Sequence, residues 1–211
     1  LEDLKPARMD EDFEKALRAF DRMKVDAVAC CGDLATSGIV PELERVGRAW
    51  NRVFPGNCRS DGAPVANLFI YGDHDMGGYA WRESKGIMPD DELKKLSIPL
   101  NDPGALWERC LGEKWSPEVV KEVKGYRFVL AHHPVHNKDT KWGDTIPGVR
   151  DALRRHRQEL AGNRPFFYLQ HRLLKGTVGG KIAWGQDSGD AKEALSAFPN
   201  CIALTGHGHI A

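Results

Sequence analysis

Short apolar segments alternate along this chain with segments in which apolar residues recur at helical spacing, and this alternation limits the possible folds more than any other feature. Nearly continuous apolar runs predict buried strands at residues 25–31, 65–71, 166–170 and 201–205. Helical spacing and helix-start signals predict helices at residues 11–23, 41–54, 149–162 and 190–198. Strands that alternate with helices in this way are typical of an α/β fold with largely buried strands.

The middle of the chain is less regular. Residues 119–133 predict two strands joined at Lys124-Gly125, and short helices are expected near Asp91 and Pro103. A length of 211 residues is enough for one well-buried core, so we expect a single domain over residues 1–211.

The composition argues against several classes of function. Thirty basic and 30 acidic residues cancel, so no overall field favours a nucleic acid or an anionic membrane. The five cysteines form no Cys-x-x-Cys pair, which argues against a disulfide framework and against a cysteine zinc site. No run approaches the roughly 20 apolar residues of a membrane span. We therefore expect a soluble protein, with its cellular compartment left open.

Four of the predicted strands are followed directly by side chains that can bind metals. The four motifs are Gly32-Asp33, Gly72-Asp73-His74-Asp75, His171 and Gly206-His207-Gly208-His209. Each motif alone has an ordinary explanation as a turn, a capped loop or a surface pair. Together they indicate a shared site, because ligands of α/β folds bind beyond the carboxyl ends of the strands.

The side-chain types at these four positions favour transition metals. Mixed carboxylate and imidazole ligands suit zinc, iron or manganese better than calcium, which prefers oxygen alone. Two such metals, about 3.5–4 Å apart, can lower the pKa of a shared water and hold both oxygens of an in-line phosphoryl displacement.

In their order along the chain, these motifs resemble those of the calcineurin-like metallophosphoesterases. That family has Asp-x-His, then Gly-Asp, then Gly-Asn-His-Asp/Glu, then a single His, then Gly-His-x-His, and the resemblance spans residues 11–209. It implies a sandwich of two packed mixed sheets flanked by helices, in the layer order α/β/β/α. It also implies two divalent metal ions, which would be manganese, zinc or iron, and a metal-bridging hydroxide as the nucleophile.

The resemblance also implies roles for individual residues. Asp33 would bridge the two metals, and His209 would serve one site alone. Asp73, His207 and the single His would complete the other site.

Two further residues would act in catalysis rather than in metal binding. His74 would lie beside the leaving-group oxygen, as a general acid or as a stabiliser of developing charge. Asp75 would be placed to orient His74.

Two residues compete for the position of the single His. His132 has the more familiar neighbourhood, Ala131-His132-His133-Pro134, whereas His171 ends the strand that precedes the strand bearing His207. We prefer His171 on this topology. His132 and His133 are then substrate-facing candidates or simple loop residues.

The chain departs from the family pattern at two points. Asp73 stands where the family usually has Asn, and this adds negative charge to the site. No Asp-x-His precedes Gly32-Asp33. We expect that the first strand, which would carry this motif, lies outside the sequence given, as does the C-terminal end of the domain. If Leu1 is the true start, we expect one metal to bind well and the second poorly, or the protein to be inactive.

Three functions remain open at this point. The leading hypothesis is a metal-dependent hydrolase that acts on phosphomonoesters or phosphodiesters. The alternative is a non-catalytic interaction module on the same scaffold, which the missing first motif and Asp73 would favour. A mononuclear metalloenzyme such as an amidohydrolase is disfavoured, because no paired-histidine strand is visible near the start.

The sequence does not identify the phosphorylated substrate, which could be a small molecule or a macromolecule. The expected activity requires no nucleic acid, and the sequence does not indicate an oligomeric state. Substrate preference would come from the loops at residues 77–116 and 134–148. Trp142, Arg172 and Lys175 are candidates to line a pocket there, with loop packing and solvated charge as the alternative.

Overall fold

Two sheets form the centre of the computed structural model, which describes residues 7–76, 90–134, 148–177 and 186–208. Strands β1 (Ala27–Cys30) and β2 (Ala66–Phe69) form a parallel pair. The second sheet has four strands in the order β3-β4-β5-β6. These are β3 (Glu118–Val123), β4 (Tyr126–Ala131), β5 (Phe166–Gln170) and β6 (Cys201–Thr205).

The second sheet is mixed. Strands β3 and β4 form an antiparallel hairpin around Lys124 and Gly125, whereas β4, β5 and β6 run parallel. In the parallel register Gln170 pairs with Thr205, so the residues that follow β5 and β6 leave the sheet at the same edge. The predicted strands at 166–170 and 201–205 are confirmed in their bounds. The expected burial holds for β5 but not for β6, where Ile202 is 44% exposed, because β6 is the last strand of the sheet.

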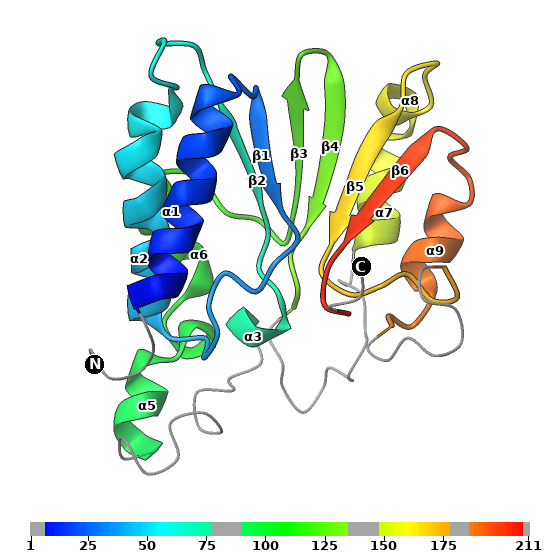
Figure 1. Cartoon of the computed structure of the whole chain (residues 1–211). Coiled ribbons are helices and arrows are strands. Elements are labelled where there is room, and N and C mark those ends of the chain that lie inside the picture. The colour runs from blue at the N-terminus through cyan, green and yellow to red at the C-terminus, as the bar shows by residue number, and fades with distance from the viewer. Residues whose placement is uncertain (1–6, 77–89, 135–147, 178–185, 209–211) are drawn as a thin grey trace.

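Helices cover the outer face of each sheet (Figure 1). The parallel pair is covered by α1 (Ala7–Arg22), α2 (Val40–Val53) and α6 (Pro103–Leu111). The four-stranded sheet is covered by α7 (Val149–Arg155), α8 (Arg157–Leu160) and α9 (Asp190–Leu195). The predicted α/β/β/α layering is therefore confirmed, with the qualification that the smaller sheet is purely parallel among the described residues.

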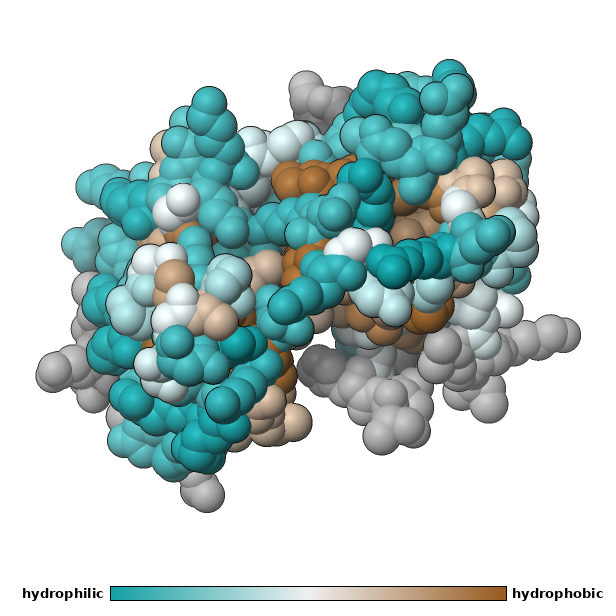
Figure 2. Space-filling model, turned by 90° about the horizontal axis from the view of Figure 1, so that it is seen from above, coloured by the Kyte–Doolittle hydropathy of each residue, from teal (hydrophilic) through white to brown (hydrophobic). Residues whose placement is uncertain are grey.

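Apolar packing between the two sheets holds the layers together. Leu68 and Ile70 of the β2 segment pack with Leu130 of β4 and Leu169 of β5, and all four side chains are almost fully buried. In the space-filling view of Figure 2, hydrophilic side chains cover much of the outside, and hydrophobic ones lie between the two halves. Burying this apolar surface is the main favourable contribution to folding.

The predicted helix at 149–162 is broken into two. His156 has φ −95° and ψ 10°, which ends α7 and starts α8 at Arg157. The predicted apolar face survives the break, because Val149, Leu153 and Leu160 remain buried. Helix α9 also ends earlier than predicted, at Leu195, although Phe198 still packs into the same core.

Four short helical segments complete the described part of the chain. They are η2 (Pro55–Asn57), α3 (Asp73–Met76), α5 (Asp90–Leu96) and η3 (Ile98–Leu100). Helix α3 is important for the site, because the polar motif after β2 forms one helical turn that begins at Asp73. Among the described residues, no helix has the length and apolar character that crossing a membrane requires.

Candidate metal centre

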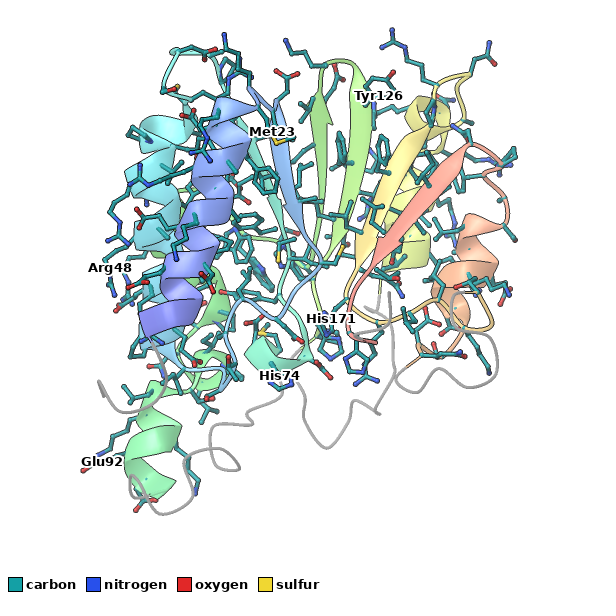
Figure 3. All side chains as sticks on the ribbon, in the orientation of Figure 1. Met23, Arg48, His74, Glu92, Tyr126 and His171 are labelled. Carbon is teal, nitrogen blue, oxygen red and sulfur yellow. The ribbon has the colours of Figure 1, made fainter. Side chains whose placement is uncertain are left out.

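The carboxyl ends of β1, β2, β5 and β6 meet at one edge of the sandwich. Figure 3 shows His74 and His171 close together at this edge, whereas Met23 and Tyr126 lie at the opposite end of the molecule. Backbone hydrogen bonds hold the strand ends in place, with Ile70 N donating to Cys30 O and Gly206 N donating to His171 O. Motifs far apart in sequence thus become neighbours.

Three buried side chains form a compact cluster at this edge. Donor atoms of Asp73, His171 and His207 all lie within 4.8 Å of one another. The Nε2 atom of His171 is 3.0 Å from Asp73 Oδ1 and 3.2 Å from His207 Nδ1. His207 Nδ1 is in turn 3.3 Å from the same Asp73 oxygen. Two imidazole nitrogens and one carboxylate oxygen therefore converge on one point, which is a suitable donor set for zinc, iron or manganese.

The orientation of His171 also suits a metal ligand. Its Nδ1 atom lies 2.7 Å from the carbonyl oxygen of Cys31, which can only accept a hydrogen bond. The proton of the neutral ring therefore lies on Nδ1, and Nε2 presents its lone pair to the cluster. Burial lowers the pKa of His171, but the Asp73 carboxylate beside Nε2 and the nearby Asp33 charge outweigh burial and raise the pKa overall. Without a metal, these carboxylates therefore favour a second proton on Nε2, which a bound cation would replace.

A second group of side chains shares Asp73 with this cluster and includes Asp33. Asp33, Asp73 and His74 form another group whose potential donor atoms are within 4.8 Å of one another. Asp33 Oδ1 accepts a hydrogen bond from His74 N at 3.1 Å and is 3.3 Å from His171 Nε2. Asp33 therefore contacts the first group through His171. Its expected role as a bridging ligand stays a prediction.

Glycine allows the strand ends to approach this closely. Gly32 has φ +98°, and a Cβ atom there would lie 2.6 Å from both His171 Nδ1 and the Gly72 Cα. A Cβ atom on Gly72 would lie 2.3 Å from Asp33 Oδ1. Both glycines in the Gly-Asp motifs are therefore required by contact distances at the site.

Asp75 holds the loop that follows β1. Its fully buried carboxylate accepts hydrogen bonds from Leu34 N, Ala35 N and Gly72 N at 3.2, 2.7 and 2.6 Å. Burial raises the pKa of Asp75 to about 7, an effect that the Gly72 hydrogen bond partly opposes. The Nδ1 atom of the His74 ring lies 2.6 Å from the carbonyl oxygen of Thr36. The expected orientation of His74 by Asp75 stays a prediction.

Arg172 is buried beside the cluster. Its side chain is 6% exposed, and Nη2 lies 3.1 Å from Asp73 Oδ2. This position is inconsistent with a solvated charge, which was one of the two expectations for this residue. Lys175, by contrast, is exposed.

His132 lies in the core and not in the cluster. Its Nδ1 atom accepts a hydrogen bond from Tyr71 N at 3.0 Å, and its ring packs edge-on against Trp107. Burial, with a smaller effect of the Lys121 charge, lowers the pKa of His132 to about 3. The His133 ring is 6.1 Å from the His171 ring, measured between centroids. The geometry thus brings His171, rather than His132, next to Asp73 and His207.

Several supporting residues had no signal in the sequence. The carbonyls of Thr36 and Cys31 contribute through the backbone, which any residue type provides. Glu42, at the start of α2, accepts hydrogen bonds from Ser37 N and Ile39 N and so fixes the loop before it. His209 and Trp142 lie outside the described residues.

Comparison with known proteins gives one finding for the chain. A family model described as calcineurin-like phosphoesterase matches residues 9–211. No curated protein matches the chain.

Proposed function

The chain belongs to the calcineurin-like phosphoesterase family, and from this membership we propose that it is a metal-dependent hydrolase of phosphomonoesters or phosphodiesters. The observation that carries the proposal is the buried convergence of Asp73, His171 and His207. An imidazole whose Nδ1 hydrogen is held by a carbonyl is prepared to bind a cation through Nε2.

We propose that Asp73, His171 and His207 would hold one metal, and that Asp33 and His209 would serve a second, with Asp33 shared between the two. When bound, divalent metals of this kind supply positive charge to the phosphoryl oxygens and an activated water. The tightly packed Gly32 and Gly72 keep the ligand-bearing loops at the required separation.

His74 is proposed to act on the leaving group. Because the Thr36 carbonyl accepts from Nδ1, the neutral ring keeps its proton there, and only the imidazolium also carries a proton on Nε2. The protonated ring can then donate a proton to the leaving-group oxygen or stabilise its negative charge. Asp75 contributes by fixing the Leu34–Ala35 backbone, next to Asp33.

The test is hydrolysis of p-nitrophenyl phosphate and of bis-p-nitrophenyl phosphate, with manganese or zinc added to metal-free protein. Asp33→Ala and His207→Ala should each abolish turnover. The matched control is His156→Ala, since His156 lies on the far side of the four-stranded sheet, at the α7–α8 junction. Undiminished turnover in both site variants would exclude the proposal.

A non-catalytic interaction module on the same scaffold is the second candidate. The observation that favours it is the ion pair between Asp73 and Arg172, because an arginine can hold a carboxylate without any metal. Metal analysis separates the two candidates. Fewer than about two metals per chain, together with no turnover, would favour the module.

A further inference from the structure

Arg172 and Asp73 form a buried ion pair at the point where the site departs from the family pattern. The Arg172 and Asp73 side chains are 6% and 4% exposed, so the pair is screened from water. A guanidinium stays charged at any pH that a protein experiences. The extra negative charge that Asp73 brings is therefore matched by a permanent positive charge 3.1 Å away.

The two oxygens of the Asp73 carboxylate have different neighbours. Oδ1 faces the nitrogens of His171 and His207 at 3.0 and 3.3 Å, whereas Oδ2 faces Arg172 Nη2. An asparagine at this position would likewise present one oxygen, with its second branch unable to bind a cation. A carboxylate with both oxygens free could bind a metal through both and would add a full negative charge, which weakens the Lewis acidity of the metal.

The position of Arg172 is fixed by a polar network beneath the site. Gln170 Nε2 donates to the carbonyl oxygen of Arg172 at 2.6 Å and to Asp187 Oδ2 at 3.0 Å. Gln170 is itself held by the Tyr168 hydroxyl, which donates to Oε1. The other oxygen of Asp187 accepts from Lys175 N and Gly189 N. The turn after β5 is thereby anchored on both sides of Arg172.

We propose that Arg172 is a positioning residue that makes Asp73 act as a charge-compensated, single-oxygen donor, equivalent to an asparagine. The inference rests on the proposed function only in that the site binds a metal. Arg172 as a whole residue is 5% exposed, so its guanidinium is not presented to a substrate. Its effect is therefore exerted through Asp73.

A double-mutant cycle with Arg172→Met, Asp73→Asn and the combined variant tests this coupling. Manganese affinity is measured by calorimetry on metal-free protein without substrate, and kcat is measured separately. Arg172→Met should bind manganese about tenfold more tightly, because the Asp73 carboxylate loses its compensating charge and can bind the cation through both oxygens. It should turn over about tenfold more slowly, at the lower end of the losses typical of residues that support metal ligands. Asp73→Asn should weaken binding, because it removes the negative charge that offsets Arg172 at 3.1 Å and so leaves the site more positive. The combined variant should return to within about threefold of wild type in both quantities.

Arg154→Met is the matched control, because Arg154 pairs with Asp151 on the surface of α7 with a 70% exposed side chain. It should leave both quantities unchanged. If Arg172→Met does not fold, Arg172→Lys replaces it; this variant keeps the charge and should hold manganese affinity within about threefold of wild type.

The inference is overturned if Arg172→Met weakens manganese binding, if Arg172→Lys changes it more than tenfold, or if the effects of the two single changes simply add. Its failure is distinguishable from failure of the proposed function. A coupled manganese affinity in a protein without turnover would support the inference and reject the hydrolase. Turnover in a protein in which the Arg172→Met and Asp73→Asn effects on manganese affinity simply add would support the hydrolase and reject the inference.

Discussion

His171 Nδ1 lies 2.7 Å from the carbonyl oxygen of Cys31, although the two residues are 140 positions apart in sequence. The hydrogen bond joins the end of β5 to the end of β1 and therefore connects the two sheets at the site. It also sets the tautomer of His171 and directs Nε2 toward Asp73. One contact thus contributes to both the architecture and the chemistry of the site.

His171→Ala is expected to remove most metal binding, because it deletes one of three converging donors. The loss should be at least as large as the 10- to 100-fold typical of supporting residues. Metal content per chain, measured after dialysis against manganese or zinc, checks this. His156→Ala serves again as control, and a His171→Ala protein that keeps its full metal content would refute the assignment.

Gly32→Ala should destabilise the protein and impair metal binding together. A methyl group there would need to lie 2.6 Å from His171 Nδ1, and the positive φ adds about 1–2 kcal/mol of backbone strain. Urea denaturation and metal titration measure the two effects.

The control for this change is Gly62→Ala, since Gly62 has φ +81° and nothing within 4 Å of the added carbon. Gly62→Ala should lower the stability through backbone strain but should leave the metal affinity unchanged. Equal metal affinity in the two variants would contradict a steric role for Gly32.

His132 is expected to stay neutral at acidic pH and to make the fold acid-sensitive. The pKa of His132 is about 3 in the folded protein, against 6.5 for an ordinary histidine, so the unfolded chain binds one more proton between these pH values. Stability is therefore full above about pH 6.5 and falls as the pH decreases toward 3, by about 2 kcal/mol at pH 5 from this group alone.

Histidine NMR at pH 5 should show the His132 ring uncharged. The variant His132→Asn, whose side-chain oxygen can accept the Tyr71 N–H, should lose this part of the pH dependence. An imidazolium signal from His132 at pH 5 would show that the ring is accessible to protons.

Asp75→Asn should destabilise the loop after β1. All three observed partners of the carboxylate are N–H donors, and an amide group would turn its own N–H toward one of them. The cost of leaving a buried donor unpaired is about 1–3 kcal/mol. Thermal unfolding measures it, with Asp61→Asn on the exposed surface as control, which should lower the stability less. Equal costs in the two variants would contradict the proposed role of Asp75.

The sequence by itself determined the elements and the edge at which the site forms. Short apolar runs predicted β5 and β6 to the residue, because apolar and β-branched residues over four to eight positions are typical of strands. Parallel strands place their carboxyl ends together, so the order of motifs was enough to expect Asp33, Asp73, His171 and His207 at one edge.

Only the tertiary structure decided which partners each polar side chain at that edge contacts. The sequence gives no signal for a backbone carbonyl as partner, so the contacts of His171 with Cys31 and of His74 with Thr36 appear only in three dimensions. The pairing of Arg172 with Asp73 likewise depends on burial, because a charged residue in a loop is solvated unless the fold encloses it. Local patterns fix which elements form, whereas the burial and hydrogen bonding of each polar group are set by segments distant in sequence.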